Sequence, residues 1–207
     1  MTGEEPSEDG DSSHGCPADA DQTFHPWTRT DPAWPVHDTE IVWETDFFEA
    51  GQDVVERPTG ERAEYYWLEP TDAAVVVAFT DENEIILVEQ YRPRLRRYSL
   101  GLPGGGVEDG EDPAVAAARE LQEETGFVAG DLSKLDSYIP TPWTRYTRHV
   151  FVARDLELTA PDRDDAEFIE CETVAAADAV DRLRDRPGPA NGISLTPLLL
   201  AREEGLL

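Results

Sequence analysis

The sequence has few cysteines, a single lysine and no long apolar run. Its two cysteines, Cys16 and Cys171, are too few for a disulfide framework, and neither has the spacing of metal ligands. A membrane-spanning helix needs roughly 20 apolar residues, and no uninterrupted run approaches that length. The N-terminus is acidic, whereas a secretory signal begins basic and continues apolar. We therefore expect a cytoplasmic protein that does not associate with membranes.

Basic residues are scarce along the whole chain. The 207 residues include 17 Lys or Arg against 45 Asp or Glu, which gives a formal net charge of -28. This charge disfavours binding to nucleic acids or to an anionic membrane surface. Only Lys134 is a lysine. A lysine-poor acidic surface is similar to that of proteins from organisms with a salt-rich cytoplasm, because salt screens the repulsion between carboxylates. We expect a halophilic source of the haloarchaeal type.

The chain is long enough for one domain of ordinary size with an appendage. Residues 1–24 contain seven acids and no Lys or Arg, which predicts a disordered acidic tail. Short runs of β-branched and aromatic residues then predict a small antiparallel sheet within residues 25–68. Residues 69–207 are expected to form the main domain.

The main domain mixes strand and helix signals. Near-continuous apolar runs at 73–79 and 85–90 predict strands buried on both faces. A helix is predicted over 113–124, with Asp112 as N-cap, Pro113 in the first turn and Gly126 after the last turn. Other expected elements are strands near 135–139, 150–153 and 167–171, and helices near 173–184 and 194–204. This order favours an α+β or α/β sandwich.

Three acids lie on one face at the end of the predicted helix. Glu120, Glu123 and Glu124 are spaced i, i+3 and i+4, so they repel one another. They also lie at the negative end of the helix dipole, where a carboxylate is unfavourable. A divalent cation would relieve both costs, and Mg²⁺ binds through a few carboxylates while keeping waters and substrate phosphate oxygens. The alternative is a solvated acidic face, which is common in so acidic a protein.

Residues 105–127 resemble the Nudix box at every fixed polar and glycine position. The pattern begins with a glycine, places one acid in the loop and ends in the acidic helix turn, at Gly105, Glu111, Arg119-Glu120-Leu121, Glu123-Glu124 and Gly126. The final hydrophobic position holds Phe127, where a smaller aliphatic is common. The resemblance implies an α/β/α sandwich with a mixed sheet, preceded by a small antiparallel N-terminal sheet.

The resemblance also implies roles for the residues of the box. Glu120, Glu123 and Glu124 would bind Mg²⁺, or Mn²⁺ as a substitute, together with the backbone carbonyl of Gly104. Arg119 can form forked hydrogen bonds to a carboxylate of the box and hold it in place. The structural positions of the motif are Gly105, Glu111, Leu121 and Gly126. Gly105 is also a candidate for substrate binding.

Nudix enzymes typically hydrolyse a nucleoside diphosphate linked to another group, by metal-assisted attack of water on phosphorus. The resemblance implies that Glu120, Glu123 and Arg119 belong to the catalytic set. The general base should be a carboxylate outside the box, and the acidic run 162–167 offers Glu167 first, then Asp165 and Asp164. For any one of these residues, a salt-adapted solvent loop is an equal interpretation.

Residues 88–93 resemble the strand before the box in ADP-ribose pyrophosphatase-like proteins. Arg92 would bind the diphosphate, whereas ion pairs with nearby acids are the simpler interpretation of Arg94, Arg96 and Arg97. Pro142, 15 residues after Phe127, favours the same branch. Two glycines depart from it, since the branch often has an acid at the position of Gly101 and alanine at that of Gly104.

The predicted N-terminal sheet matches the position of an extra sheet in that branch. In the branch this sheet joins two subunits into a homodimer and supplies aromatic side chains to the adenine. Trp43 and Phe47 are the corresponding candidates for substrate binding here, and Phe48, Tyr66 and Trp67 are also aromatic. Packing in the core is an equal alternative for each of them.

The sequence therefore predicts Mg²⁺-dependent hydrolysis of ADP-ribose or a related nucleoside diphosphate sugar, giving AMP or another NMP and a sugar phosphate. A pyrophosphohydrolase that removes oxidised nucleoside triphosphates is the main alternative, although such proteins are usually shorter and lack the N-terminal sheet. A non-catalytic, ligand-sensing regulator would be expected to show a degenerate box. An isopentenyl diphosphate isomerase would need a reactive cysteine in the pocket.

Overall fold

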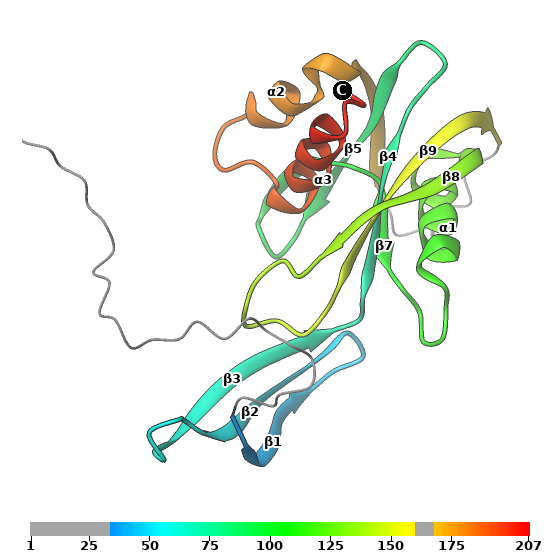
Figure 1. Cartoon of the computed structure of the whole chain (residues 1–207). Helices are drawn as coiled ribbons and strands as arrows, with labels where there is room; N and C mark the ends of the chain where they lie inside the picture. Colours follow the sequence, from blue (N-terminus) through cyan, green and yellow to red (C-terminus); the bar gives the residue numbers. More distant parts are fainter. Residues whose placement is uncertain (1–33, 160–167) are drawn as a thin grey trace, which may run out of the picture.

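The computed structural model describes residues 34–159 and 168–207. Its first part is a three-stranded antiparallel sheet in the order β1-β2-β3, formed by β1 (Val36–Glu44), β2 (Phe48–Glu56) and β3 (Arg62–Pro70). This sheet extends from one end of the molecule (Figure 1). The acidic tail predicted at 1–24 lies outside the described residues.

The centre of the main domain is a mixed four-stranded sheet in the order β7-β4-β9-β8. Its members are β4 (Ala73–Ala78), β7 (Gly104–Gly106), β8 (Phe127–Tyr138) and β9 (Arg148–Leu158). β4 pairs in parallel with β9, and the other pairs are antiparallel. Every residue of β4 is buried, as its continuous apolar run predicts.

A second antiparallel sheet has the order β10-β5-β6. It consists of β5 (Glu84–Arg92), β6 (Arg97–Gly101) and β10 (Ile169–Ala175). The helical elements are α1 (Pro113–Thr125), the short 3-10 helix η1 (Ala176–Asp178), α2 (Ala179–Arg184) and α3 (Gly192–Glu203). Among the described helices, none is both long and apolar enough to span a membrane.

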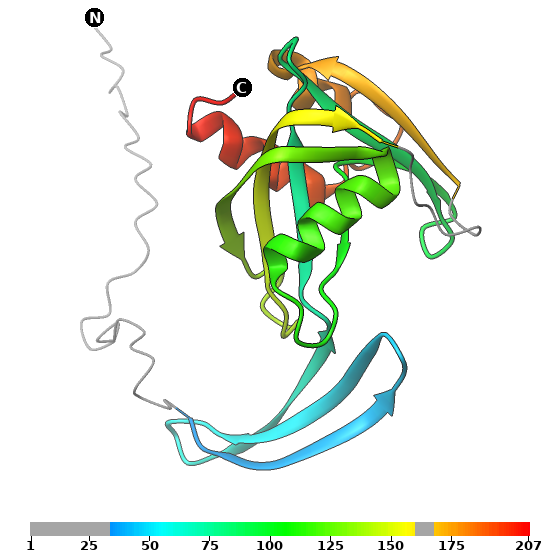
Figure 2. The same ribbon diagram turned by 90° about the vertical axis from the view of Figure 1, so that its right-hand side faces the viewer.

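The helices cover the central sheet from opposite sides, α1 on one face and α3 on the other (Figures 1 and 2). Side chains alternate along β4, so Val75 and Val77 join the core under α2 and α3, while Ala74 and Val76 join the core under α1. The α/β/α sandwich with a mixed sheet and an additional small antiparallel sheet is thus confirmed.

Helix α1 begins and ends where its capping residues predict. The side chain of Asp112 accepts a hydrogen bond from the backbone N–H of Ala114 at 2.8 Å, and Pro113 is the first helical residue. Gly126 has a φ of 79°, a left-handed conformation that glycine adopts without strain, and the helix stops there. These caps fix which turn of the helix carries Glu120, Glu123 and Glu124.

The prediction of a helix from residue 173 is wrong at its start. Residues 173–175 belong to β10, where Thr173 and Val174 pair with Ile86 and Ile85 of β5. Thr173 and Val174 are β-branched and favour a strand, which here pairs with β5. Helical structure therefore begins only at Ala176. The strands expected near 135–139 and 150–153 are parts of the longer β8 and β9.

A buried carboxylate connects the N-terminal sheet to the main domain. Asp53 of β2 accepts hydrogen bonds at 3.0 Å from the indole N–H of Trp67 and from the hydroxyl of Thr39. It also forms an ion pair with Arg145, whose guanidinium lies 4.1 Å from the centre of the Trp67 ring. Nearby, Leu68 exchanges two backbone hydrogen bonds with residues 143 and 145, so the sheet is anchored on the loop before β9.

This anchor predicts that Asp53→Asn destabilises the fold. The substitution removes the charge that Arg145 neutralises and turns one acceptor into a donor, and a lost hydrogen bond to a charged group costs about 1.5–3 kcal/mol. For a chain of this size we expect a melting temperature lower by roughly 3–12 °C. Asp46→Asn, at an exposed position, is the matched control. Equal melting temperatures for the two variants in a thermal unfolding experiment would contradict this role.

Candidate active site

The acidic last turn of α1 lies directly against the glycine loop that forms β7. Glu124 is 5% exposed, and its Oε2 accepts a hydrogen bond from the backbone N–H of Gly104 at 2.9 Å. This bond ties the end of the helix to the loop and fixes the Glu124 carboxylate in the interior. The structure thereby brings together the glycines and acids that the sequence motif separates by about 20 positions.

Two glycines permit this close approach because a side chain at either position would force neighbouring atoms to move. A Cβ on Gly105 would overlap the carboxylate of Glu120, and a Cβ on Gly104 would overlap the backbone of Ala74 and Val75 in β4. The carboxylate of Glu120 therefore rests on bare backbone. Alanine, which the related branch often has at the position of Gly104, would require the loop to shift from β4.

Arg119 binds the other two acids of this turn and the loop together. Its NH1 donates to Glu120 at 2.8 Å and to Glu123 at 3.1 Å, and its NH2 donates to the carbonyl of Gly106 at 3.0 Å. Arg119 also makes a forked pair of 3.1 Å hydrogen bonds with Glu111. One guanidinium thus holds three carboxylates and one carbonyl in a fixed arrangement.

Glu111 is the loop partner of this arginine. Besides Arg119, its carboxylate accepts the backbone N–H of Glu108 at 2.9 Å, which closes the turn before α1. The hydrogen bond from Arg119 lowers the pKa of Glu111 below its ordinary value of 4.5, and the N–H of Glu108 acts in the same direction. Glu111 in turn raises the pKa of Arg119, which stays charged.

The donor set fits a hard divalent cation, although the carboxylates are engaged within the protein. In the described ranges, no three Asp, Glu, His or Cys side chains converge into a metal-binding group. Arg119 holds Glu120 and Glu123, and the Gly104 N–H holds Glu124. The bare backbone of Gly105 lets the carboxylate of Glu120 lie directly against the loop, and carboxylate and carbonyl oxygens are the donors that Mg²⁺ prefers.

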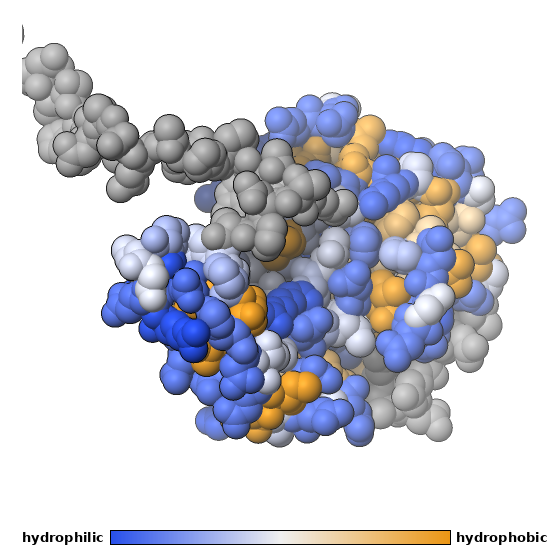
Figure 3. Space-filling view, turned by 60° about the horizontal axis from the view of Figure 1, so that its bottom comes forward, coloured by the Kyte–Doolittle hydropathy of each residue, from blue (hydrophilic) through white to orange (hydrophobic). Residues whose placement is uncertain are grey.

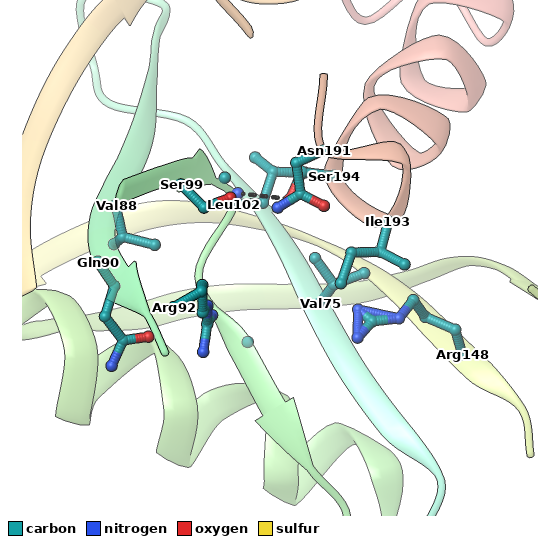
Figure 4. Close-up of a pocket in the computed structure, with 12 residues that line it drawn as sticks. Val75, Val88, Gln90, Arg92, Ser99, Leu102, Arg148, Asn191, Ile193 and Ser194 are labelled. Carbon is teal, nitrogen blue, oxygen red and sulfur yellow. Dashed lines mark hydrogen bonds between the residues drawn. The ribbon is translucent and has the colours of Figure 1, made fainter. Parts of the chain in front are cut away.

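A pocket adjoins the glycine loop on the side of α3. It is a small hollow that is partly open to solvent, and both Gly104 and Arg92 line it. Figure 4 shows Arg92 at its wall. Arg94, Arg96 and Arg97 do not line it, and within the described residues none of the three forms an ion pair with an acid. Arg97 instead donates to the carbonyl of Pro189 at 3.0 Å.

The pocket contains residues that the sequence did not single out, Gln90, Arg148, Asn191 and Ser194 among them. Arg148 enters because β9 lies beside β4, and Asn191 and Ser194 enter because α3 packs over β6. Both contacts join parts of the chain that lie far apart in the sequence. The segment 88–93, whose resemblance to the related branch points to Arg92, also contains Gln90.

The aromatic candidates of the N-terminal sheet are exposed and do not line this pocket. Trp43 is 60% and Phe47 is 70% exposed, and Figure 3 shows apolar side chains on this part of the surface. Trp67, in contrast, is buried as part of the Asp53 anchor. The candidates for the general base, Glu167 and Asp165, and also Asp164, lie outside the described residues.

Comparison with known proteins identifies the class of protein that has this fold and this site. The NUDIX domain model matches residues 69–195. The chain therefore belongs to the Nudix family, and it is a Nudix hydrolase.

Similar proteins cover most of the chain. An "ADP-ribose pyrophosphatase" of Bacillus subtilis (strain 168) is 36% identical over 135 residues, which are 64% of this chain and 73% of the relative. A "Methanol dehydrogenase activator" of Bacillus methanolicus is 32% identical over 151 residues, 72% of this chain and 82% of the relative. A solved structure described as an ADP compounds hydrolase superposes with a TM-score of 0.74 at 29% identity, covering 83% of this chain and 93% of its own.

The Glu111–Arg119 pair predicts a pH-dependent contribution to stability. Because folding lowers the pKa of Glu111, its ionised form stabilises the fold above about pH 4.5, and this contribution is lost as the pH falls through the lowered pKa. We expect Glu111→Gln to lower the melting temperature near pH 7, and the difference from wild type to shrink below pH 4.5. Asp109→Asn, at an exposed neighbour, should show no such trend. A difference that stays constant with pH would exclude this coupling.

Proposed function

We propose that this Nudix hydrolase cleaves the pyrophosphate bond of ADP-ribose or a related nucleoside diphosphate sugar in a Mg²⁺-dependent reaction, giving AMP or another NMP and a sugar phosphate. The observation that carries the proposal is the acidic turn of α1 pressed against Gly104 and Gly105, beside a pocket that contains Arg92. The names of the Bacillus subtilis relative and of the solved structure support the substrate class.

The residues divide into those that hold the cation and those that hold the substrate. Glu120, Glu123, Glu124 and the carbonyl of Gly104 would bind Mg²⁺, with Mn²⁺ as a substitute. When bound, the cation would neutralise the diphosphate and lower the pKa of a bound water. Arg119 holds the carboxylates of Glu120 and Glu123 in position through its hydrogen bonds to both.

Substrate binding and proton transfer involve other parts of the chain. Arg92 would bind a phosphate from the pocket wall, since a guanidinium presents paired N–H donors to phosphate oxygens. The general base would come from the acidic run before β10, with Glu167 preferred over Asp165. That strand follows the run directly and pairs with β5, the strand that carries Arg92.

The N-terminal sheet supports a homodimer. All of β1 is exposed, and the large apolar side chains of this sheet that face solvent are Val36, Ile41, Val42, Trp43, Tyr65 and Tyr66. Exposed apolar side chains gathered on one sheet favour a protein partner, and a second copy would cover the same surface symmetrically. In that dimer Trp43 and Phe47 would reach the base of the nucleotide.

The proposed metal ligands predict that Glu124→Gln abolishes turnover while the fold is retained. The amide keeps one oxygen acceptor but removes the charge that attracts Mg²⁺. We expect a loss well beyond tenfold in the release of AMP from ADP-ribose, with an unchanged circular dichroism spectrum. Glu108→Gln, at an exposed loop position, should retain wild-type turnover.

Two results would contradict the proposal. Activity of Glu124→Gln within about tenfold of wild type, a difference of 1.4 kcal/mol, would exclude Glu124 as a metal ligand. A clear preference for an oxidised nucleoside triphosphate over ADP-ribose and an NDP-hexose, assayed with Mg²⁺ in high salt, would overturn the substrate class.

A further inference from the structure

The pocket beside Gly104 has no acidic residue in its lining, although the chain contains 45 acids. Its charged members are two arginines, Arg92 from the end of β5 and Arg148 from the start of β9. Two cations that face one hollow repel each other, and the chain has many acids that could pair with them. An acid-free, doubly cationic hollow in a protein of net charge -28 indicates a site that binds an anion from solution.

Arg148 is the more informative of the two because it is largely buried. Its Nε is inaccessible to solvent and has no hydrogen-bond partner, and within the described residues its side chain forms no ion pair. Burial lowers the pKa of Arg148, the charge of Arg92 lowers it further, and the nearby phenols of Tyr138 and Tyr146 act in the opposite direction. A buried N–H donor without a partner is unfavourable in the folded protein, and an anion bound in the pocket would relieve the repulsion between Arg148 and Arg92.

A second side chain in the same pocket also lacks its partner. The Oε1 of Gln90 is buried and accepts no hydrogen bond. Gln90 precedes Arg92 by two positions on β5, so both side chains lie on the same face of the strand. Figure 4 shows both with Arg148 around one hollow. Two residues that line the pocket thus each have one buried polar atom without a partner, the donor Nε of Arg148 and the acceptor Oε1 of Gln90.

We propose that Arg148 and Gln90 form a subsite for a phosphorylated sugar. Arg148 donates to the phosphate oxygens, whose geometry matches the guanidinium fork, and the Oε1 of Gln90 accepts a hydrogen bond from a sugar hydroxyl. A fully ionised phosphate group has no hydrogen to donate to Gln90, and a neutral sugar would leave the charge of Arg148 without an anion. The assignment of a sugar phosphate rests on the proposed function, in which it is either half of the intact substrate or the released product.

The test measures binding of ribose 5-phosphate and of inorganic phosphate by isothermal titration calorimetry, in low-salt buffer without divalent cations. Wild type is expected to bind both, the sugar phosphate more tightly. Arg148→Met should weaken both by at least about tenfold, because it removes the charged donor. Gln90→Leu should weaken ribose 5-phosphate only. Arg94→Gln, the same loss of charge outside the pocket, should bind like wild type.

The melting temperature of Arg148→Met distinguishes a ligand-binding role of Arg148 from a structural role. If Arg148 serves a ligand, Arg148→Met removes an unpaired buried charge, and its melting temperature without ligand should equal or exceed that of wild type. A lower melting temperature for Arg148→Met with unchanged ligand binding would overturn the proposal, as would equal binding of ribose 5-phosphate by all four proteins. If Arg148→Met does not fold, Arg148→Lys, which keeps the charge and loses the fork, must still weaken phosphate binding.

The source of the ligand and the proposed function are tested separately. An increased KM of Arg148→Met for ADP-ribose would show that the subsite binds the sugar phosphate half of the intact substrate. Binding of ribose 5-phosphate without such a change in KM would show that the subsite binds the released product. Arg148-dependent binding in a protein that does not hydrolyse ADP-ribose would refute the proposed function alone. Normal hydrolysis with binding independent of Arg148 would refute the subsite alone.

Discussion

The contact between the acidic turn of α1 and the bare backbone of Gly104 and Gly105 determines the rest of the site. It places one buried carboxylate on the Gly104 N–H and a second against the Cα of Gly105. The loop that makes this contact is also β7, an edge strand paired with β4, so the site is anchored in the central sheet. The pocket that contains Arg92 begins on the other side of the same loop.

Charges are arranged differently on the two sides of this loop. On the side of α1, acids outnumber the single arginine, and Arg119 contacts three of them. On the side of α3, two arginines share a pocket without an acid. A divalent cation would relieve the excess of acids on the first side, and a phosphate would relieve the excess of arginines on the second. The overall charge of -28 hides this local reversal.

Local signals were sufficient for the parts of the site that are close in sequence. The capping residues located α1 correctly, and the spacing of its acids predicted that they share one turn. The start of β10 was mistaken for helix because its pairing with β5 overrides the local preference. Arg148 and the Asp53 anchor were missed for a similar reason. Both depend on strands or loops that meet only after the chain folds, such as β4 with β9.

The account rests on the claim that the bare backbone of the loop makes the acidic turn a cation site. The most direct test compares Mn²⁺ binding, followed by electron paramagnetic resonance, in wild type and in Gly105→Ala. The added methyl group would displace the carboxylate of Glu120 without removing any charge. We predict binding in wild type and at least about tenfold weaker binding in the variant, with unchanged circular dichroism. Equal Mn²⁺ affinity in the two folded proteins would contradict the account.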